Sequence, residues 1–392
     1  MGGLERVRDC DGDDGTFLDE SFPLDVYSPQ FHDTYTYNVH IITKSSDSKT
    51  SAVPATEPIL SLRPRYIKQP SNSYIEKTVI VTLSTILTAT IKTKDASSST
   101  IQEFISSLQK SEDERALVIK LRADNDFYSI VPHLEEYKLN PIPSDIKKLP
   151  PFLPCPIVEE ETEGMVNSND NVDGDNTKTV NRIVEVNKTG LGSSAALVNS
   201  LVGVLLAYFD VVSIPSSSSA TAAATMDNKQ EKNNDLKLVH NLAQICHSFA
   251  QGESGSGFDV SAAVYGSHVY TRFDKSIITS VMDKLSNYLA QCKNDGSDSS
   301  YKNYGEKVIM ANTGLELWKC ISDFDKWNAQ VHPLSLPLGV QVLMADICGE
   351  SESPSMAKNV LAWKKNKEEE AKKVADVEKV VDGSISNNGA TE

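Results

Sequence analysis

A glycine turn between a strand-like segment and a long apolar segment constrains this chain most. Residues 188–196 read KTGLGSSAA; the strand-like RIVEVN (Arg182–Asn187) precedes them, and an apolar run to Val212 follows. Glycines let the backbone turn tightly and expose successive N–H groups, and a helix N-terminus adds the positive end of its dipole. Ser193 and Ser194 add hydroxyls. The pattern predicts an anion site, most naturally for the phosphates of a nucleotide.

This turn matches neither of two common phosphate motifs, because it is not GxxxxGK[ST] and not GxGxxG. It could also merely cap a core helix, since residues 195–209 are apolar nearly all round. The two roles are compatible.

A second glycine-rich segment carries a candidate general base. Gly252–Val260 reads GESGSGFDV, so Asp259 follows a flexible run. A carboxylate beside a phosphate loop could accept a proton from a substrate oxygen that attacks a γ-phosphoryl group. It could equally be an ordinary aspartate of a glycine-rich turn. His247, on the preceding predicted helix, is expected to be a packed or surface histidine.

Hydrophobic periodicity predicts a mixture of strands and helices. The helix at 73–91 has a good cap candidate in Asn72, although its threonines also suit a strand. Residues 258–273 suit a strand or a short helix pair. The other predicted strands are 22–43, 116–122, 182–187 and 337–347, and the other predicted helices are 236–251 and 356–381.

Composition narrows the class of partner. The chain has 392 residues and a formal net charge of −16, which argues against nucleic acid or an anionic membrane as partner. Six cysteines stand far apart without a CxxC pattern, which is typical of reduced thiols in a cytosolic protein. The charged N-terminus lacks the apolar segment of a signal peptide. We therefore expect a soluble, cytoplasmic protein, and its charge leaves an anionic small molecule possible as a partner.

Four segments, in order along the chain, resemble one enzyme family. Residues 188–196 resemble the second motif of the GHMP small-molecule kinases, in the KTGLGSSAA form of the phosphomevalonate kinases. Residues 250–267 resemble AQGKxGSGFDVSxAVYGS, with Glu253 where the common form has lysine. Asn125–Ser129 is similar to the family's NDFYS segment, and the stretch from Ser353 is similar to TPSMVKKVLEW.

The resemblance implies an α+β fold of the GHMP kinase type, with a domain like ribosomal protein S5 domain 2 and a truncated ferredoxin-like domain. It implies transfer of the γ-phosphoryl group of ATP, with Mg²⁺, to 5-phosphomevalonate. Its implied base is Asp259, and its implied metal contacts are Ser193 and Gln251. The implied phosphate-binding residues are Lys188, Thr189, Gly190, Leu191, Gly192, Ser193, Ser194 and Ala195, and the implied substrate-binding residues are Asn125, Tyr128, Ser129, Ser256 and Ser355.

The same resemblance sets the expected domain limits. Residues 21–275 are expected to form the ATP-binding domain, with disordered insertions near 159–179 and 215–235, and 276–381 a partial second domain. Residues 1–20 and 382–392 are expected to be disordered. Neither the family's PGKVLxxGxY motif nor its GAGGGD-type loop is found, so low activity is expected. The alternatives are a non-catalytic relative that binds nucleotide or a partner, and a sibling GHMP kinase with another acceptor.

Overall fold

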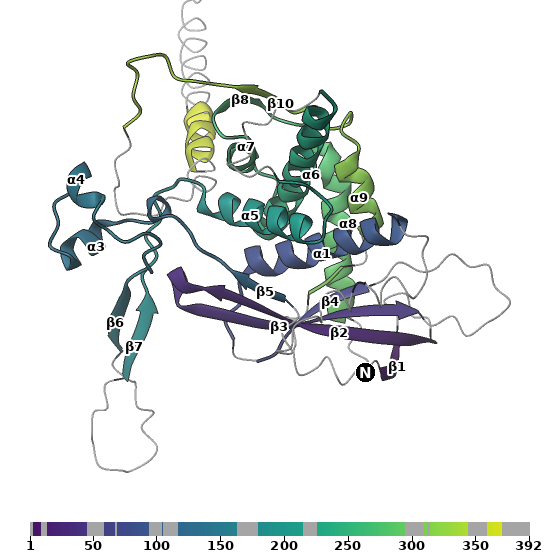
Figure 1. The fold of residues 1–392 in the computed structure, drawn as a ribbon. Coiled ribbons are helices and arrows are strands. Elements are labelled where there is room, and N and C mark those ends of the chain that lie inside the picture. The colour runs from purple at the N-terminus through teal and green to yellow at the C-terminus, as the bar shows by residue number, and fades with distance from the viewer. Residues whose placement is uncertain are drawn as a thin grey trace, which may run out of the picture.

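A mixed six-stranded sheet forms the floor of the molecule (Figure 1). The computed structural model describes residues 3–8, 14–44, 59–66, 69–93, 104, 117–162, 179–214, 226–294, 309–311, 314–343 and 359–370. The sheet follows the order β1 (Gly3–Arg8), β2 (Asp14–Ser28), β3 (Asp33–Lys44), β4 (Ile59–Pro64) and β9 (Ile309–Ala311), and β5 (Leu117–Lys120) pairs with β2. The β2–β5 pair is parallel, and the other pairs in this sheet are antiparallel.

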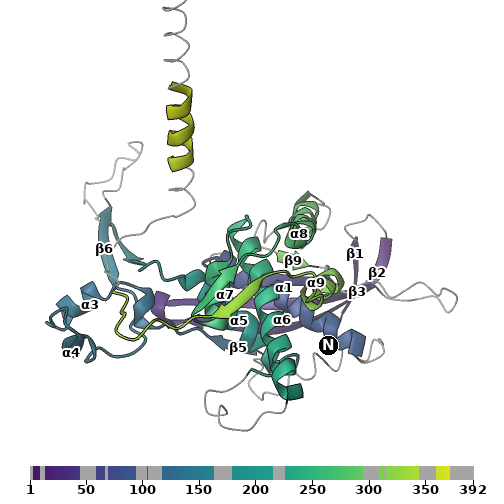
Figure 2. The ribbon, with the colours of Figure 1, turned by 90° about the horizontal axis from the view of Figure 1, so that it is seen from above.

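The alternation predicted for 22–43 produces a long hairpin. Strands β2 and β3 pair from Phe17↔Lys44 to Ser28↔Asp33, and the 3-10 turn η1 (Pro29–Phe31) lies between them. Alternate side chains such as Leu24, Val26 and Val39 are fully buried, because successive side chains of a strand point to opposite faces. Helix α1 (Ser73–Thr93) covers this buried face, and α5 (Ser193–Tyr208) and α6 (Met226–Gln251) pack on α1 (Figures 1 and 2).

The remaining elements surround this frame. Helices α8 (Ser276–Asn294) and α9 (Gly314–Ser322) contribute Ile278, Leu285 and Leu317 to the core that α1 and α6 also form. The smaller elements are η2 (Asn125–Phe127), α3 (Val131–Glu136), α4 (Pro143–Ile146) and α7 (Phe258–Tyr265), with two antiparallel pairs, β6 (Ile157–Thr162) with β7 (Thr179–Val184) and β8 (His268–Thr271) with β10 (Gln330–Pro333). Figure 1 shows the β6–β7 hairpin projecting from the body near α3 and α4.

Helix α1 is the central core element, and Asn72 caps it as predicted. The Asn72 side chain accepts hydrogen bonds from the backbone N–H groups of Tyr74 at 3.1 Å and Ile75 at 3.3 Å. Ser73–Ile91 is long and apolar enough to cross a membrane, but 78% of its most apolar window is buried inside the protein. Contacts with the sheet and with α5, α6 and α9 account for that apolarity.

Several sequence expectations differ from the structure. Within residues 1–20, expected to be disordered, Gly3–Arg8 and Asp14–Ser28 pair as β1 and β2, with Leu4 opposite Leu18. Within 215–235, expected to be a disordered insertion, α6 already begins at Met226. The apolar second half of α6 nucleates the helix, and each polar residue added upstream then gains one backbone hydrogen bond.

Two more differences concern strands. The insertion expected near 159–179 begins and ends in the paired strands β6 and β7, and residues 163–178 lie outside the described residues. The strand predicted at 337–347 is absent from its described part, 337–343, which contains a turn closed by the Val340 N–H and the Pro337 carbonyl at 3.1 Å. Pro337 and Gly339, with φ of 83°, favour a turn there.

Other expectations are confirmed. The structure has an α+β architecture, β5 lies within the predicted segment 116–122, β3 ends one residue beyond the predicted segment 22–43, and residues 359–370 are helical. The strand predicted at 182–187 is confirmed only at 182–184, where it forms the end of β7. The three cysteines with described side chains, Cys155, Cys246 and Cys320, are free and buried. The boundary at residue 275 stays a prediction, and residues 382–392 lie outside the described residues.

Replacement of Gly314 by alanine is expected to destabilise the fold by about 1–3 kcal/mol. A Cβ atom there would lie 2.5 Å from the Ser84 carbonyl oxygen of α1. This steric clash is not easily relieved, because the carbonyl belongs to the backbone of a packed helix. Gly203→Ala in α5 is the matched control, because its Cβ would meet a movable Ile214 methyl at 3.3 Å. Thermal unfolding should show a lower Tm for Gly314→Ala only, and equal losses for the two variants would contradict the close packing of α9 on α1.

Candidate active site

The predicted phosphate loop ends at the N-terminus of α5, as the sequence indicated. Gly192 caps this helix with φ of 75°, a left-handed conformation that favours glycine. The first intrahelical bond runs from the Ala196 N–H to the Gly192 carbonyl at 3.0 Å. The N–H groups of residues 193–195 precede that bond, so they have no carbonyl partner within the helix. The α5 N-terminus therefore suits an anion.

The segment Asn125–Ser129 packs directly on this loop. Tyr128 and Lys188 form an antiparallel bridge, the Ser129 N–H donates to the Asn187 carbonyl at 2.7 Å, and the Thr189 N–H donates to the Phe127 carbonyl at 3.2 Å. Burial raises the pKa of Tyr128 to about 12, and its side chain hydrogen-bonds to Ser193. Two segments selected separately in the sequence therefore meet in space.

Asp259 lies against the other side of the loop. It belongs to the first turn of α7, whose N-cap Gly257 has φ of 77°. Gly257 has no room for a side chain, because a Cβ atom there would lie 2.5 Å from the side-chain amide oxygen of Gln244. The side-chain amide nitrogen of Gln244 donates a hydrogen bond to the Gly257 carbonyl at 2.8 Å. A Cβ on Gly192 would lie 3.6 Å from the Asp259 Cβ. The N-termini of α5 and α7 are therefore adjacent.

His247 connects these two helix ends. Its Nε2 lies 3.2 Å from the Ser194 Oγ and 3.9 Å from the Asp259 Oδ2. Burial lowers the pKa of His247, and the Asp259 charge acts in the opposite direction. The sequence interpretation expected His247 to be a packed or surface histidine without a functional role. A usable signal was present, because His240, Gln244, His247 and Gln251 repeat at helical spacing among the apolar residues of the second half of this helix.

A cleft of about 760 Å³ opens beside the loop. Its walls are the edge strand β5, the start of α1 and the exposed side of α5, and it contains Ser193 and Ser194. Lys120, Arg122 and Lys188 line it together with Asp33 and Asp124, so its lining carries a small excess of positive charge in a chain of net charge −16. The sequence interpretation missed Tyr35, Asn72 and Tyr74, which also line this cleft, because only the fold brings them to it.

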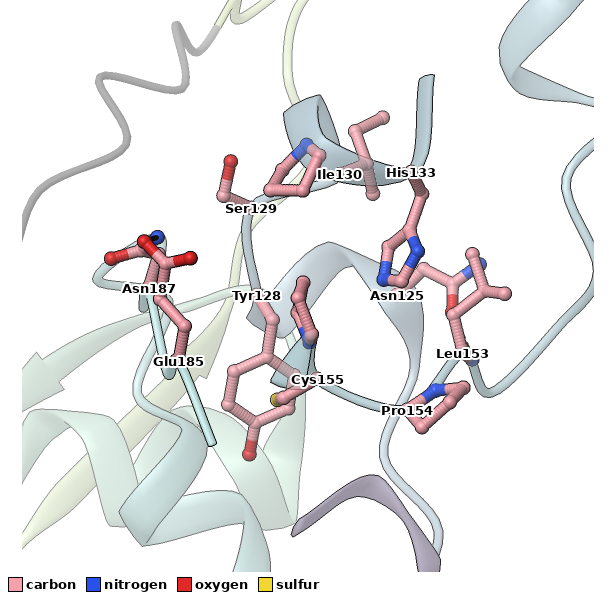
Figure 3. Close-up of a pocket in the computed structure, with 12 residues that line it drawn as sticks. Asn125, Tyr128, Ser129, Ile130, His133, Leu153, Pro154, Cys155, Glu185 and Asn187 are labelled. Atoms are coloured by element: carbon pink, nitrogen blue, oxygen red, sulfur yellow. Dashed lines mark hydrogen bonds between the residues drawn. The ribbon is translucent and has the colours of Figure 1, made fainter. Parts of the chain in front are cut away.

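A second, much smaller pocket lies behind Asn125–Ser129 (Figure 3). At about 10 Å³ it has room for roughly one water molecule. Both polar ends of Asn125 are used within the chain, since its amide nitrogen donates to the Pro150 carbonyl and its oxygen accepts from the Leu153 N–H, each at 2.8 Å. Asn125 therefore holds the 150–153 segment in place in this structure.

The remaining predicted site residues lie apart from the cleft or outside the described residues. Gln251 is exposed at the end of α6, Ser256 is exposed between α6 and α7, and neither lines the cleft. Of the predicted site residues, Tyr128, Lys188, Ser193 and Ser194 line the cleft, whereas Asp259, residues 189–192, Ala195, Asn125 and Ser129 lie outside its lining. Ser355 lies outside the described residues. Among the residues that the structure describes, no group of three or more His, Cys, Asp or Glu side chains could hold a metal ion.

These features define an α+β protein with a glycine-rich loop that lies against two helix N-termini. In sequence the chain is similar to phosphomevalonate kinases, as its motifs indicated. It is 35% identical to that of Candida albicans over 220 residues (56% of this chain, 40% of the relative). It is 36% identical to that of Aspergillus fumigatus over 196 residues (48% and 32%) and 30% identical to the peroxisomal phosphomevalonate kinase of Arabidopsis thaliana over 261 residues (66% and 42%).

The chain thus spans 32–42% of the length of these three curated relatives. No family model matches the chain. No solved structure matches it either. One relative is named peroxisomal, and the cytoplasmic location expected from the sequence stays a prediction.

Proposed function

We propose that this chain carries part of a phosphomevalonate kinase, and that its cleft binds ATP and 5-phosphomevalonate for phosphoryl transfer. A terminal phosphate oxygen of 5-phosphomevalonate attacks the γ-phosphorus of ATP, the bond to the β,γ-bridging oxygen breaks, and 5-diphosphomevalonate and ADP leave. The observation that carries the proposal is the convergence of three family segments: residues 125–129 pair with 187–189, and Gly192 lies against Asp259.

The proposed roles follow from charge and geometry. The N–H groups at the start of α5 and the Ser193 and Ser194 hydroxyls would bind the phosphates of ATP. Lys120, Arg122 and Lys188 would offset the charge of two polyanionic substrates. Asp259 would accept a proton from the attacking phosphate or orient it. The reaction needs no covalent enzyme intermediate, so positioning and charge neutralisation supply the rate.

Mg²⁺ is part of the proposal, and the residues present would supply only few of its ligands. Mg²⁺ keeps several waters and substrate phosphate oxygens as ligands and takes only one or two from the protein. When bound, it would neutralise charge on the β- and γ-phosphates. Ser193 lines the cleft and could supply one hydroxyl oxygen, whereas the position of Gln251 outside the cleft lining fits that role poorly.

The test is ADP release with Mg·ATP and each of three acceptors: 5-phosphomevalonate, mevalonate and galactose. We expect turnover with 5-phosphomevalonate to exceed that with the other two. Turnover of only mevalonate or galactose would identify a sibling kinase. ATP binding by calorimetry without turnover of any acceptor would support the non-catalytic alternative. Absence of both binding and turnover would contradict the proposed site.

A further inference from the structure

One buried histidine contacts both helix N-termini of the candidate site. The His247 side chain is 5% exposed, and its Nε2 faces the Ser194 hydroxyl of α5 and the Asp259 carboxylate of α7. Helix α6, which carries His247, is itself held at its end, because the Lys77 ammonium group of α1 donates to the Phe249 carbonyl at 2.8 Å. The imidazole is therefore a fixed group between two elements that the proposed reaction must keep in register.

The protonation state of this ring follows from its surroundings. Burial favours the neutral form, which carries one N–H. An ionised Asp259 carboxylate can only accept hydrogen bonds, so a lone pair on Nε2 would repel it. A proton on Nε2 attracts both the Asp259 Oδ2 at 3.9 Å and the Ser194 Oγ at 3.2 Å. The Nε2–H tautomer is therefore favoured.

A hydrogen-bond donor near Asp259 would offset the repulsion between its carboxylate and bound phosphates. Asp259 lies against Gly192, at the loop that would bind the phosphates of ATP, and anionic phosphates repel a carboxylate. On the helix side, the Val260 N–H donates to its Oδ1 at 2.9 Å. A second donor toward Oδ2 would keep the carboxylate in place when the phosphates bind.

We propose that His247 is a positioning residue, whose Nε2–H holds the Asp259 carboxylate and the Ser194 hydroxyl in the arrangement that phosphoryl transfer requires. The proposal rests on the proposed function for its kinetic consequence only. Its structural content, a hydrogen on Nε2 that stabilises ionised Asp259, can be measured without turnover.

Two variants separate positioning from packing. His247→Leu fills similar volume without a donor, and His247→Gln places an amide N–H near the Nε2 position. We expect kcat to fall about 10- to 100-fold in His247→Leu, with the KM for ATP changed less than about threefold, because misplacement of a reacting group costs rate more than binding. His247→Gln should recover most of the loss.

Nuclear magnetic resonance gives the readout that does not depend on activity. Ring ¹⁵N shifts of His247 should report the Nε2–H tautomer. The Asp259 carboxyl ¹³C signal, assigned by its absence in Asp259→Asn, should move in His247→Leu, because the group that faces its Oδ2 is lost. His247→Gln should keep the signal near its wild-type position.

A matched control tests whether the effect is local. His40→Leu removes another histidine beside a carboxylate, since His40 Nδ1 lies 2.8 Å from the Asp19 Oδ1 on the sheet, and it should leave the Asp259 carboxyl signal unchanged. A proton on Nδ1 of His247, or an identical Asp259 carboxyl signal in wild type and His247→Leu, would overturn the proposal. The expected tautomer and carboxyl signal in a protein that turns over no acceptor would instead count against the proposed function alone.

Discussion

Asp259→Asn is expected to lower turnover of 5-phosphomevalonate by about 10²- to 10⁴-fold, the usual share of a positioned acid or base. The substitution keeps the shape of the side chain and removes the carboxylate beside Gly192 and His247. Substrate binding should change much less than kcat, because the loop and the cleft stay intact. The measurement is ADP release at saturating Mg·ATP and acceptor.

Asp283→Asn is the control for the loss of one negative charge. Asp283 is exposed on α8 and does not line the cleft, so its variant should turn over like the wild type. If Asp259→Asn retained a third or more of wild-type kcat, the base assignment would be wrong, and the carboxylate would have only a structural role at the start of α7.

Gly192→Val is expected to weaken Mg·ATP binding about 10- to 100-fold, since a β-branched residue at positive φ costs about 1–3 kcal/mol. With φ of 75° at Gly192, the backbone must leave its left-handed conformation, and the first N–H groups of α5 then point elsewhere. Calorimetric titration with Mg·ATP measures the loss directly.

Gly339→Val provides the same backbone strain in another place. Gly339 has φ of 83° in the exposed turn after Pro337 and has nothing within 4 Å of its Cβ position. That variant should lose stability comparable to Gly192→Val but bind Mg·ATP like the wild type. Equal ATP affinity in wild type and Gly192→Val would show that the loop does not bind the phosphates.

Features encoded within a few neighbouring residues were predictable from the sequence. Asn72 before an apolar run indicated a helix start, and the glycines on both sides of Leu191 indicated a turn at the α5 N-terminus. The packing of the 125–129 segment on the loop was not derivable from periodicity, because it joins residues about 60 positions apart. One example is the hydrogen bond from the Thr189 hydroxyl to the Asp126 carbonyl. Only the family resemblance linked them.

The features that the sequence interpretation missed depend on tertiary packing. His247 has the spacing of a core residue, and its contact with Ser194 exists because α6 packs on α5. Helix α6 starts earlier than its composition suggests, because a stable apolar half extends a polar one. Strand β5 forms one wall of the cleft, and its parallel pairing with β2 brings Lys120 opposite Tyr27.

The attachment of α1 to the end of α6 has a mechanical consequence. Lys77 and Ser73 of α1 hydrogen-bond to the carbonyls of Phe249 and Ala250 at 2.8 and 3.3 Å, and Asn72 and Tyr74 at the same end of α1 line the cleft. One wall of the cleft is therefore fastened to the helix that carries His247. The rings of Tyr74 and His247 also lie 5.8 Å apart, so a ligand in the cleft would contact the residue next to the imidazole.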